Sequence, residues 1–120
     1  INITSGWGMR GGRGNFMYSI AKGGVIQLTK TLAMTYARDN IRVTCIAPGS
    51  IPHRQSPEQR AQRDSLQPIG RTGYGVEIGP LAVLLASDAS DYMTGEIVLL
   101  DGAAIAAGVT PGGAVPHAEG

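Results

Sequence analysis

Short β-favouring runs alternate with helical stretches along this 120-residue chain, and that order constrains its fold more than any other feature. Apolar residues recur at helical spacing from about residue 16 to residue 37. β-favouring runs flank this stretch at residues 1–4 and 41–47, and a crossover of this length implies a parallel, right-handed βαβ unit. A shorter helix at 80–86 and a strand at 96–100 complete a β-α-β-α-β order. The sequence therefore predicts an α/β fold, half of a doubly wound parallel sheet.

The long predicted helix carries apolar residues on several sides. One stripe consists of Val25, Leu28 and Leu32, and it is flanked by Ile20, Ala21 and Met34. Gly23 and Gly24 lie inside the helix, where each costs on the order of 1 kcal/mol relative to alanine. We therefore expect another backbone, such as the helix of a second subunit, to pack closely against this glycine pair. Asn15 is expected to cap the helix.

Composition indicates one globular domain and excludes several function classes. Apolar residues make up 42% and charged residues 16% of the chain. Its formal net charge is +1, and the sequence has no run of basic residues. This near balance favours a small-molecule partner over nucleic acid. No apolar run approaches the roughly 20 residues that cross a bilayer. The single Cys45 excludes an internal disulfide and favours a reducing, cytoplasmic location. No metal-ligand pattern is evident.

The segment from residue 53 to residue 67 is polar and is expected to form a short surface helix, a flap. Ser56, Pro57 and Gln59 have the pattern of an N-cap, a first-turn proline and a capping-box partner. The flap also carries Arg54, Arg60 and Arg63. These arginines would favour an anionic substrate, although arginines on a short surface helix are commonly just solvated.

Tyr18 and Lys22 lie four residues apart at the start of the long helix, so both face the same side one turn apart. A phenol ionises near pH 10 and is a poor acid or base at neutrality unless a positive charge stabilises the phenolate. Lys22 can supply that charge. The same spacing also occurs on many solvated helix faces, so the rest of the chain has to decide between the two interpretations.

A glycine-rich loop between the first strand and the helix offers a competing motif. Two overlapping dinucleotide-binding patterns can be written there, from Gly6, Gly8 and Gly11 and from Gly8, Gly12 and Gly14. Such a loop should be followed by a second strand that ends in an acidic or basic residue for the ribose. The second strand here ends in Pro48-Gly49 instead, so a pyrophosphate site in this loop is the less favoured interpretation.

Ser5 lies thirteen residues before Tyr18, at the carboxyl end of the first strand, where ligands of parallel sheets bind. Together Ser5 and the Tyr18-x-x-x-Lys22 pattern resemble the short-chain dehydrogenase/reductase family. Further similar stretches follow in order: Asn2 to Ser5, Asn40 to Gly49, Gly70-Arg71, Leu85 to Asp88, Tyr92 to Gly95 and Asp101-Gly102. The resemblance covers residues 1 to about 105, the carboxyl-terminal half of a Rossmann-type domain, and leaves an Ala/Gly/Pro-rich tail at 106–120.

The resemblance implies an NAD- or NADP-dependent alcohol dehydrogenase or carbonyl reductase. Tyr18 would exchange a proton with the substrate oxygen, Lys22 would stabilise the phenolate and hold the nicotinamide ribose, and Ser5 would orient the substrate oxygen. Pro48, Gly49 and Ile51 would lie beside the nicotinamide. A homo-oligomer, a dimer or a tetramer formed through the long helix and the last strand, is also implied.

The sequence departs from the family pattern at several positions. His53 stands where a threonine usually reaches the carboxamide, and it takes over that role or is simply solvated. Gly75-Val76 replaces the usual residues before the late helix, so that helix is expected to be shortened. Trp7 and Met9 are candidate pocket residues.

The family's pyrophosphate loop, its asparagine-rich strand and its catalytic asparagine have no counterpart in this sequence. We therefore expect an N-terminal half, in the same chain or as a partner, to complete the enzyme. The alternative is a non-catalytic or truncated subunit that keeps the fold for assembly.

Overall fold

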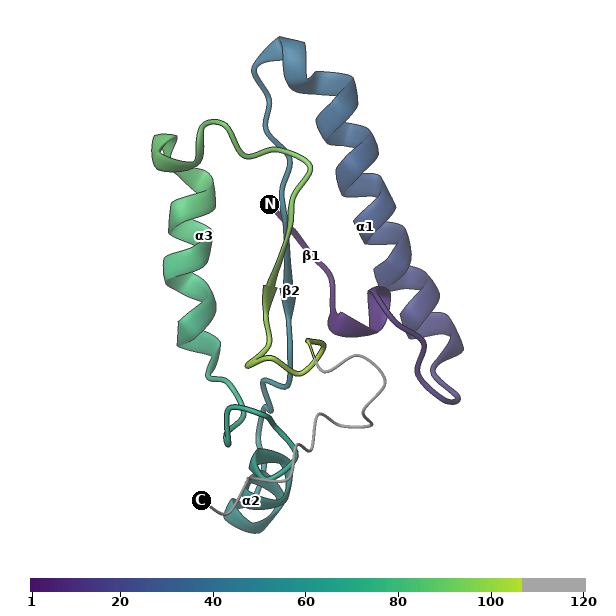
Figure 1. The fold of residues 1–120 in the computed structure, drawn as a ribbon, viewed down its shortest axis with the longest axis vertical. Helices are drawn as coiled ribbons and strands as arrows, with labels where there is room; N and C mark the ends of the chain where they lie inside the picture. The colour runs from purple at the N-terminus through teal and green to yellow at the C-terminus, as the bar shows by residue number, and fades with distance from the viewer. Residues whose placement is uncertain (107–120) are drawn as a thin grey trace.

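The computed structural model describes residues 1–106 and shows a three-stranded parallel sheet with helices (Figure 1). The longer elements are β1 (Asn2–Ile3), α1 (Phe16–Tyr36), β2 (Cys45–Pro48), α2 (Pro57–Asp64), α3 (Ile78–Ala86) and β3 (Ile97–Leu100). Short 3-10 turns lie at η1 (Gly6–Gly8), η2 (Ala37–Asp39), η3 (Gly75–Glu77) and η4 (Asp88–Ser90). The predicted α/β class is confirmed. The tail predicted at 106–120 lies, apart from its first residue, outside the described residues.

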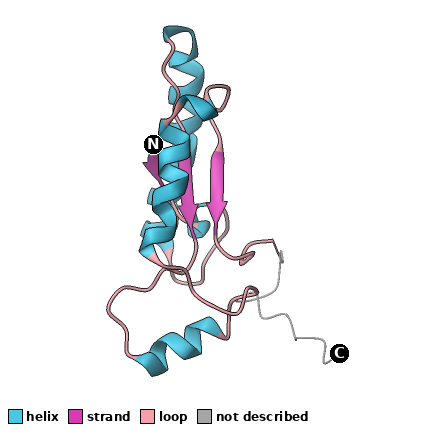
Figure 2. Cartoon of the chain, turned by 90° about the vertical axis from the view of Figure 1, so that its left-hand side faces the viewer, coloured by secondary structure: helices cyan, strands magenta, loops and turns pink. Residues whose placement is uncertain are grey.

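The strands pair in the order β1-β2-β3, with Asn2 opposite Cys45 and Cys45 opposite Ile97. α1 and α3 lie on opposite sides of this sheet (Figure 1). α2 lies beyond the carboxyl ends of the strands, away from both helical layers (Figure 2). Only loops and α2 therefore border the carboxyl edge of the sheet. In parallel sheets, ligands bind at this edge.

β2 is the centre of the core because it has a strand on each side. Cys45, Ile46 and Ala47 have no exposed surface. Parallel strands covered on both faces are continuously apolar rather than alternating, and this short run has that character. Burial raises the pKa of the Cys45 thiol, which suits a core residue rather than a reactive one. The strand is shorter than the predicted 41–47 and starts only at Cys45.

α1 ends one residue before the predicted boundary, but the side that faces the sheet differs from the predicted stripe. Its buried residues are Ile26, Thr29 and Ala33. Leu28 is 51% exposed. Thr29 can face the sheet because its hydroxyl donates to the Val25 carbonyl and accepts from the Asn2 amide. When a helix is apolar on several sides, its hydrophobic periodicity does not indicate which side packs on the sheet. In α1 the two hydrogen bonds of Thr29 are compatible with burying the side that periodicity did not predict.

Helix starts follow local hydrogen bonding. Ser56 and Gln59 form the predicted reciprocal capping box at α2, with bonds of 3.1 and 3.2 Å. The prediction that the Asn15 side chain caps α1 is wrong, since it makes no cap bond. α3 begins at Ile78 and not at Pro80, because a proline in the first helical turn interrupts no helical hydrogen bond.

Within residues 1–106, no helix has both the length and the apolar character that crossing a bilayer would require. The same residues contain no group of three or more His, Cys, Asp or Glu side chains arranged to hold a metal ion.

Candidate active site

A cleft of about 480 Å³ opens at the carboxyl ends of the strands, beside α2. Of the predicted site residues, Ser5, Tyr18, Pro48, Gly49 and Ile51 all line it. They come from three separate segments: the end of β1, the first turn of α1 and the end of β2. The structure therefore brings together five of the six predicted positions, and it places the sixth, Lys22, one helical turn behind Tyr18.

Ser5 follows β1 and is nearly buried, with 8% of its surface exposed. Its hydroxyl oxygen accepts a hydrogen bond from the Trp7 backbone N–H at 3.2 Å and so caps η1. A hydroxyl that accepts from the backbone keeps its own proton for another acceptor. The Ser5 hydroxyl is thus held in place as a donor at the cleft wall.

Tyr18 and Lys22 have the relation that their spacing predicts. The Lys22 ammonium lies 5.8 Å from the centre of the Tyr18 ring. It also donates to the Ile3 carbonyl at 3.3 Å, so it is anchored at the end of β1. An ammonium has three protons to donate, and this contact uses one of them. Tyr18 is 46% exposed and is one of the residues that line the cleft.

The glycine-rich loop packs directly on α1. A Cβ at Gly8 would lie 2.7 Å from the Lys22 carbonyl carbon and oxygen, and the Thr4 hydroxyl donates to that oxygen at 2.6 Å. Gly23 faces the same loop, since a Cβ there would lie 3.5 Å from the Gly8 oxygen. Close packing within the chain therefore explains Gly8, whereas a Cβ at Gly23 would make only an ordinary van der Waals contact. Another backbone, that of Gly8, lies against Gly23 as expected, and Gly24 has nothing within 4 Å. The packing of a second subunit against this pair stays a prediction.

The ends of β2 and β3 meet closely beside the cleft. A Cβ at Gly49 would lie 2.7 Å from Cα and Cβ of Asp101, and the Gly49 N–H donates to Leu100 at 2.9 Å. Only a glycine allows this approach. The Asp101 carboxylate accepts from the N–H groups of Ala103 and Ile105, each at 3.0 Å. Residues 101–106 are therefore held in turns that form one wall of the cleft.

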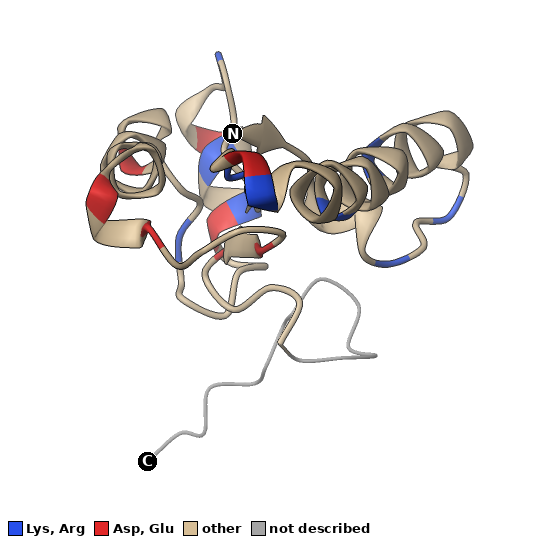
Figure 3. Cartoon of the chain, turned by 90° about the horizontal axis from the view of Figure 1, so that it is seen from above, with Lys and Arg blue, Asp and Glu red and all other residues tan. Residues whose placement is uncertain are grey.

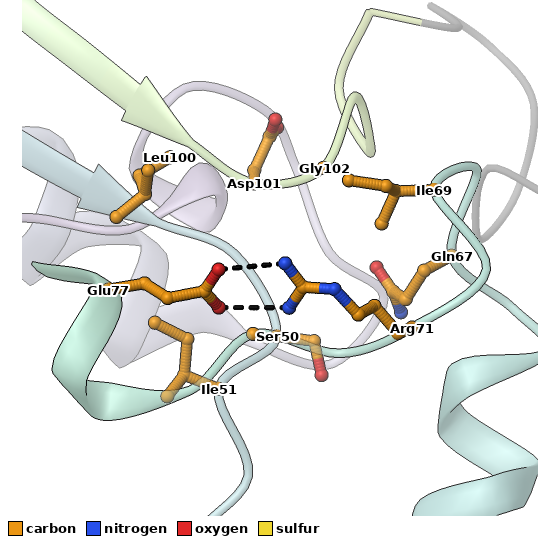
Figure 4. A pocket seen from close by; sticks show the side chains of 10 residues that line it. Ser50, Ile51, Gln67, Ile69, Arg71, Glu77, Leu100, Asp101 and Gly102 are labelled. Carbon is orange, nitrogen blue, oxygen red and sulfur yellow. Dashed lines mark hydrogen bonds and ion pairs between the residues drawn. The ribbon is translucent and has the colours of Figure 1, made fainter.

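A smaller pocket of about 120 Å³ adjoins the cleft and shares Ser50, Ile51, Gln67 and Asp101 with it. Figure 4 shows the bidentate ion pair that lines this smaller pocket, in which Arg71 donates to both oxygens of Glu77, at 2.7 and 2.9 Å. These hydrogen bonds from Arg71, with a further one from the Tyr74 backbone, lower the pKa of Glu77 to about 2. The pair closes the turn whose Gly73 N–H donates to the Ser50 carbonyl, and it lines the smaller pocket but not the cleft that contains Ser5 and Tyr18.

Of the other residues that the sequence suggested for the site, one lines the cleft and two do not. Trp7 lines the cleft as predicted, whereas Met9 is exposed and does not. His53 is exposed and is not among the described residues that line either pocket, which favours the solvated interpretation.

Sequence reasoning missed further cleft residues, among them Arg10, Leu66, Gln67, Asp101 and Ile105. Of these residues, only the position of Asp101 could have been predicted from the sequence. It directly follows a predicted parallel strand, and the carboxyl ends of parallel strands lie at the same edge of the sheet.

Comparison with known proteins identifies the family. Residues 1–103 match the family model described as enoyl-(acyl carrier protein) reductase. A short-chain dehydrogenase from Leptospira borgpetersenii, solved with bound NAD⁺, superposes with a TM-score of 0.76 at 30% identity, over 95% of this chain and 43% of that one. The chain belongs to the short-chain dehydrogenase/reductase family.

Other members of the short-chain dehydrogenase/reductase family are similar over most of this chain. The 3-oxoacyl-[acyl-carrier-protein] reductase FabG of Chlamydia trachomatis is 40% identical over 109 residues, which cover 85% of this chain and 43% of that protein. A Pseudomonas aeruginosa RhlG/NADP active-site complex superposes with a TM-score of 0.78 at 33% identity, over 84% of this chain and 44% of that one. The chain thus spans less than half the length of the relatives it matches.

Proposed function

We propose that this chain forms the catalytic half of an NAD- or NADP-dependent oxidoreductase, an alcohol dehydrogenase or carbonyl reductase. The observation that carries the proposal is the placement of Ser5 and Tyr18 in one cleft at the carboxyl edge of a parallel sheet, with the Lys22 ammonium beside the Tyr18 ring. The family relationship supports the class of reaction. NAD⁺ in one structural neighbour and NADP in another support the cofactor class.

The three side chains have complementary tasks in this proposal. The Ser5 hydroxyl donates to the substrate oxygen and orients it. During reduction the Tyr18 hydroxyl gives its proton to the carbonyl oxygen, and during oxidation the phenolate takes a proton from the alcohol. The Lys22 ammonium stabilises the phenolate by its positive charge. A nicotinamide held by Lys22 and beside Pro48 and Gly49 would supply the hydride for reduction and take it up in oxidation, which balances the proton that Tyr18 exchanges.

The residues present fit one end of such a cofactor. Lys22 retains two N–H donors beyond its bond to Ile3, and these suit the hydroxyls of a nicotinamide ribose. Pro48, Gly49 and Ile51 line the cleft next to Tyr18 and offer a mainly apolar surface for the ring. Because Gly8, which both glycine patterns share, packs against the Lys22 backbone, we place the pyrophosphate site in an N-terminal half that completes the protein. The chain covers 43% to 44% of the length of the relatives compared above, which supports this.

Substituting Tyr18 tests the proposal. In the complete protein, Tyr18→Phe removes the proton donor without removing the ring, so we expect turnover to fall about 10²- to 10⁴-fold. Nicotinamide absorbance with a panel of ketones and alcohols is the measurement. Tyr36→Phe, at the other end of α1, is the matched control and should retain wild-type turnover. Undiminished turnover by Tyr18→Phe would refute the proposed chemistry.

We also propose that the protein assembles as a homo-oligomer through α1 and β3. Ile20, Leu28 and Met34 on α1 and Leu99 on β3 are 40% to 85% exposed, which supports further packing on these faces. The same observation favours the second candidate function, a non-catalytic subunit that serves assembly. A cytoplasmic location stays a prediction from the single cysteine.

A further inference from the structure

The three arginines of the flap occupy different environments, although the sequence pattern does not distinguish them. Arg60 donates to the Thr72 carbonyl at 3.3 Å, lies 3.8 Å from Asp64 and stacks over the Tyr74 ring at 4.3 Å. It is therefore engaged in holding α2 to the following turn. Arg54 is exposed and does not line the cleft. Of the three, only Arg63 lines the cleft that contains Ser5 and Tyr18.

A second arginine reaches the same cleft from a distant segment. Arg10 lies on the loop that leads into α1, where Figure 3 shows basic positions. Its guanidinium lies 4.9 Å from the centre of the Trp7 ring, and both residues line the cleft. Stacking on an aromatic face engages the flat side of a guanidinium and leaves its N–H edge free to bind an oxyanion. The contact with Trp7 thus keeps the Arg10 guanidinium at the cleft.

The charges in the cleft are not balanced by the described residues that line it. Its one carboxylate, Asp101, already accepts a backbone N–H at each oxygen. Among residues 1–106 the ion pairs are Arg60 with Asp64 and Arg71 with Glu77, so neither Arg10 nor Arg63 has a carboxylate partner there. Arg63 has a neutral partner, since the suitably oriented Gln55 amide oxygen lies 3.0 to 3.3 Å from all three of its guanidinium nitrogens. An amide oxygen does not neutralise the positive charge, and a charged oxyanion can replace it as the acceptor.

The residues that line the cleft indicate which chemical groups a substrate would carry. Ser5 and Tyr18 mark the reacting end, apolar side chains such as Leu66 and Ile105 also line the cleft, and the two guanidinium groups provide charge. We infer that the cleft takes a carbonyl or alcohol substrate with an apolar body and an oxyanion group, a carboxylate or a phosphate, which Arg10 and Arg63 bind. This inference rests on the proposed oxidoreductase function and specifies its substrate class. A guanidinium is suited to either oxyanion because its donors match both geometries.

The test compares charged and neutral substrates in the complete protein. The substrates are oxo acids of increasing chain length, their methyl esters, and keto phosphates of matching length. We expect kcat/KM to favour the charged compounds over the esters. Arg10→Gln and Arg63→Gln should each lower kcat/KM for the charged compounds about tenfold, mainly through KM, and change it less than about twofold for the esters. The better of the two charged series identifies the oxyanion.

Two variants provide matched controls. Arg13→Gln changes the same loop as Arg10, and Arg54→Gln changes the same flap as Arg63, but neither residue lines the cleft. Both controls should retain the preference for charged substrates. Equal kcat/KM for acids and esters in the wild type, or an equal loss in the control variants, would overturn the inference. If turnover of neutral ketones depends on Tyr18 while no acid is preferred, the inference fails and the proposed function stands.

A binding measurement covers the case in which no compound of the panel is turned over. Hexanoate is titrated while the emission of Trp7, identified by difference from Trp7→Phe, is followed. We expect a saturable change with hexanoate that 1-hexanol does not produce and that Arg10→Gln weakens about tenfold. The same response to hexanol, or an unchanged response in Arg10→Gln, would contradict an oxyanion site.

Discussion

Lys22 connects the first strand to the first helix through both ends of the residue. Its backbone carbonyl accepts from the Thr4 hydroxyl at 2.6 Å, and its ammonium donates to the Ile3 carbonyl at 3.3 Å. Both partners directly precede Ser5, so these bonds hold the end of β1, and the serine with it, close to the turn of α1 that carries Tyr18. The relative placement of the three proposed catalytic side chains therefore depends on contacts that Lys22 itself makes with the two residues before Ser5.

Gly8 provides a residue-scale prediction. A methyl group there would lie 2.7 Å from backbone atoms of Lys22, which cannot turn aside as a side chain can. We expect Gly8→Ala to lower the free energy of unfolding by about 1–3 kcal/mol, as overpacking commonly does, and to lower turnover by separating Ser5 from Tyr18. Urea denaturation is the measurement.

Gly11→Ala is the control for this prediction, since nothing lies within 4 Å of a Cβ at Gly11 and its φ is negative. Equal stability of the two variants would show that the loop moves freely away from α1.

At the scale of elements, short polar connections hold the flap and α3 in place. Asp64 at the end of α2 accepts from both the N–H and the hydroxyl of Thr72, at 2.6 Å each, and this lowers its pKa. The Arg71–Glu77 ion pair closes the next turn and leads into α3. The capping box of α2 and the helical spacing of α1 were readable in the sequence because they are local. The partners of Asp64 and Glu77 were not, because turns of this kind have no periodic pattern.

Glu77 provides an element-scale prediction about pH. Its pKa is lowered from 4.5 in a model carboxyl to about 2 in the folded protein, so the ion pair contributes stability that is complete above pH 4.5. That contribution is lost as the pH falls from 4.5 through about 2. We expect Glu77→Gln to be less stable than the wild type at pH 6 and to approach it at pH 2–3, as measured by urea denaturation.

Glu96→Gln, which removes an exposed carboxylate outside the described ion pairs, is the control and should follow the wild-type profile. If the difference in free energy of unfolding between Glu77→Gln and the wild type stays constant from pH 6 to pH 2, the stability that Glu77 contributes does not come from its charge.

For the whole molecule, the described core is small relative to the apolar surface that stays exposed. β1 and β3 are both edge strands, and Ile1 and Ile3 are 51% and 46% exposed. Phe16 and Met17 at the start of α1 are each 76% exposed. Surfaces of this kind on an α/β unit are typical of contact with another domain or subunit, which is consistent with the proposed N-terminal half and oligomer.

The outer face of α1 provides a prediction at this scale. If Leu28 packs against another copy, Leu28→Glu buries an unpaired charge and should shift the complete protein toward smaller species. Size-exclusion chromatography with light scattering measures the mass. Lys30→Glu, which changes a residue that is already charged and exposed, should retain the wild-type mass. An unchanged mass for Leu28→Glu would exclude this part of α1 from the interface.

The sequence by itself determined the order of strands and helices, the Tyr18–Lys22 pair on one face of a helix, and the position of Ser5 at a strand end. Each of these follows from periodicity, spacing or local hydrogen bonding within a few residues. Only the tertiary structure decided which side of α1 faces the sheet and which arginines reach the cleft. Arg10 and Arg63 come from a loop and a flap far apart in the chain. They share one cleft because long-range packing of both segments against the strand ends places them there, and no local pattern encodes that contact.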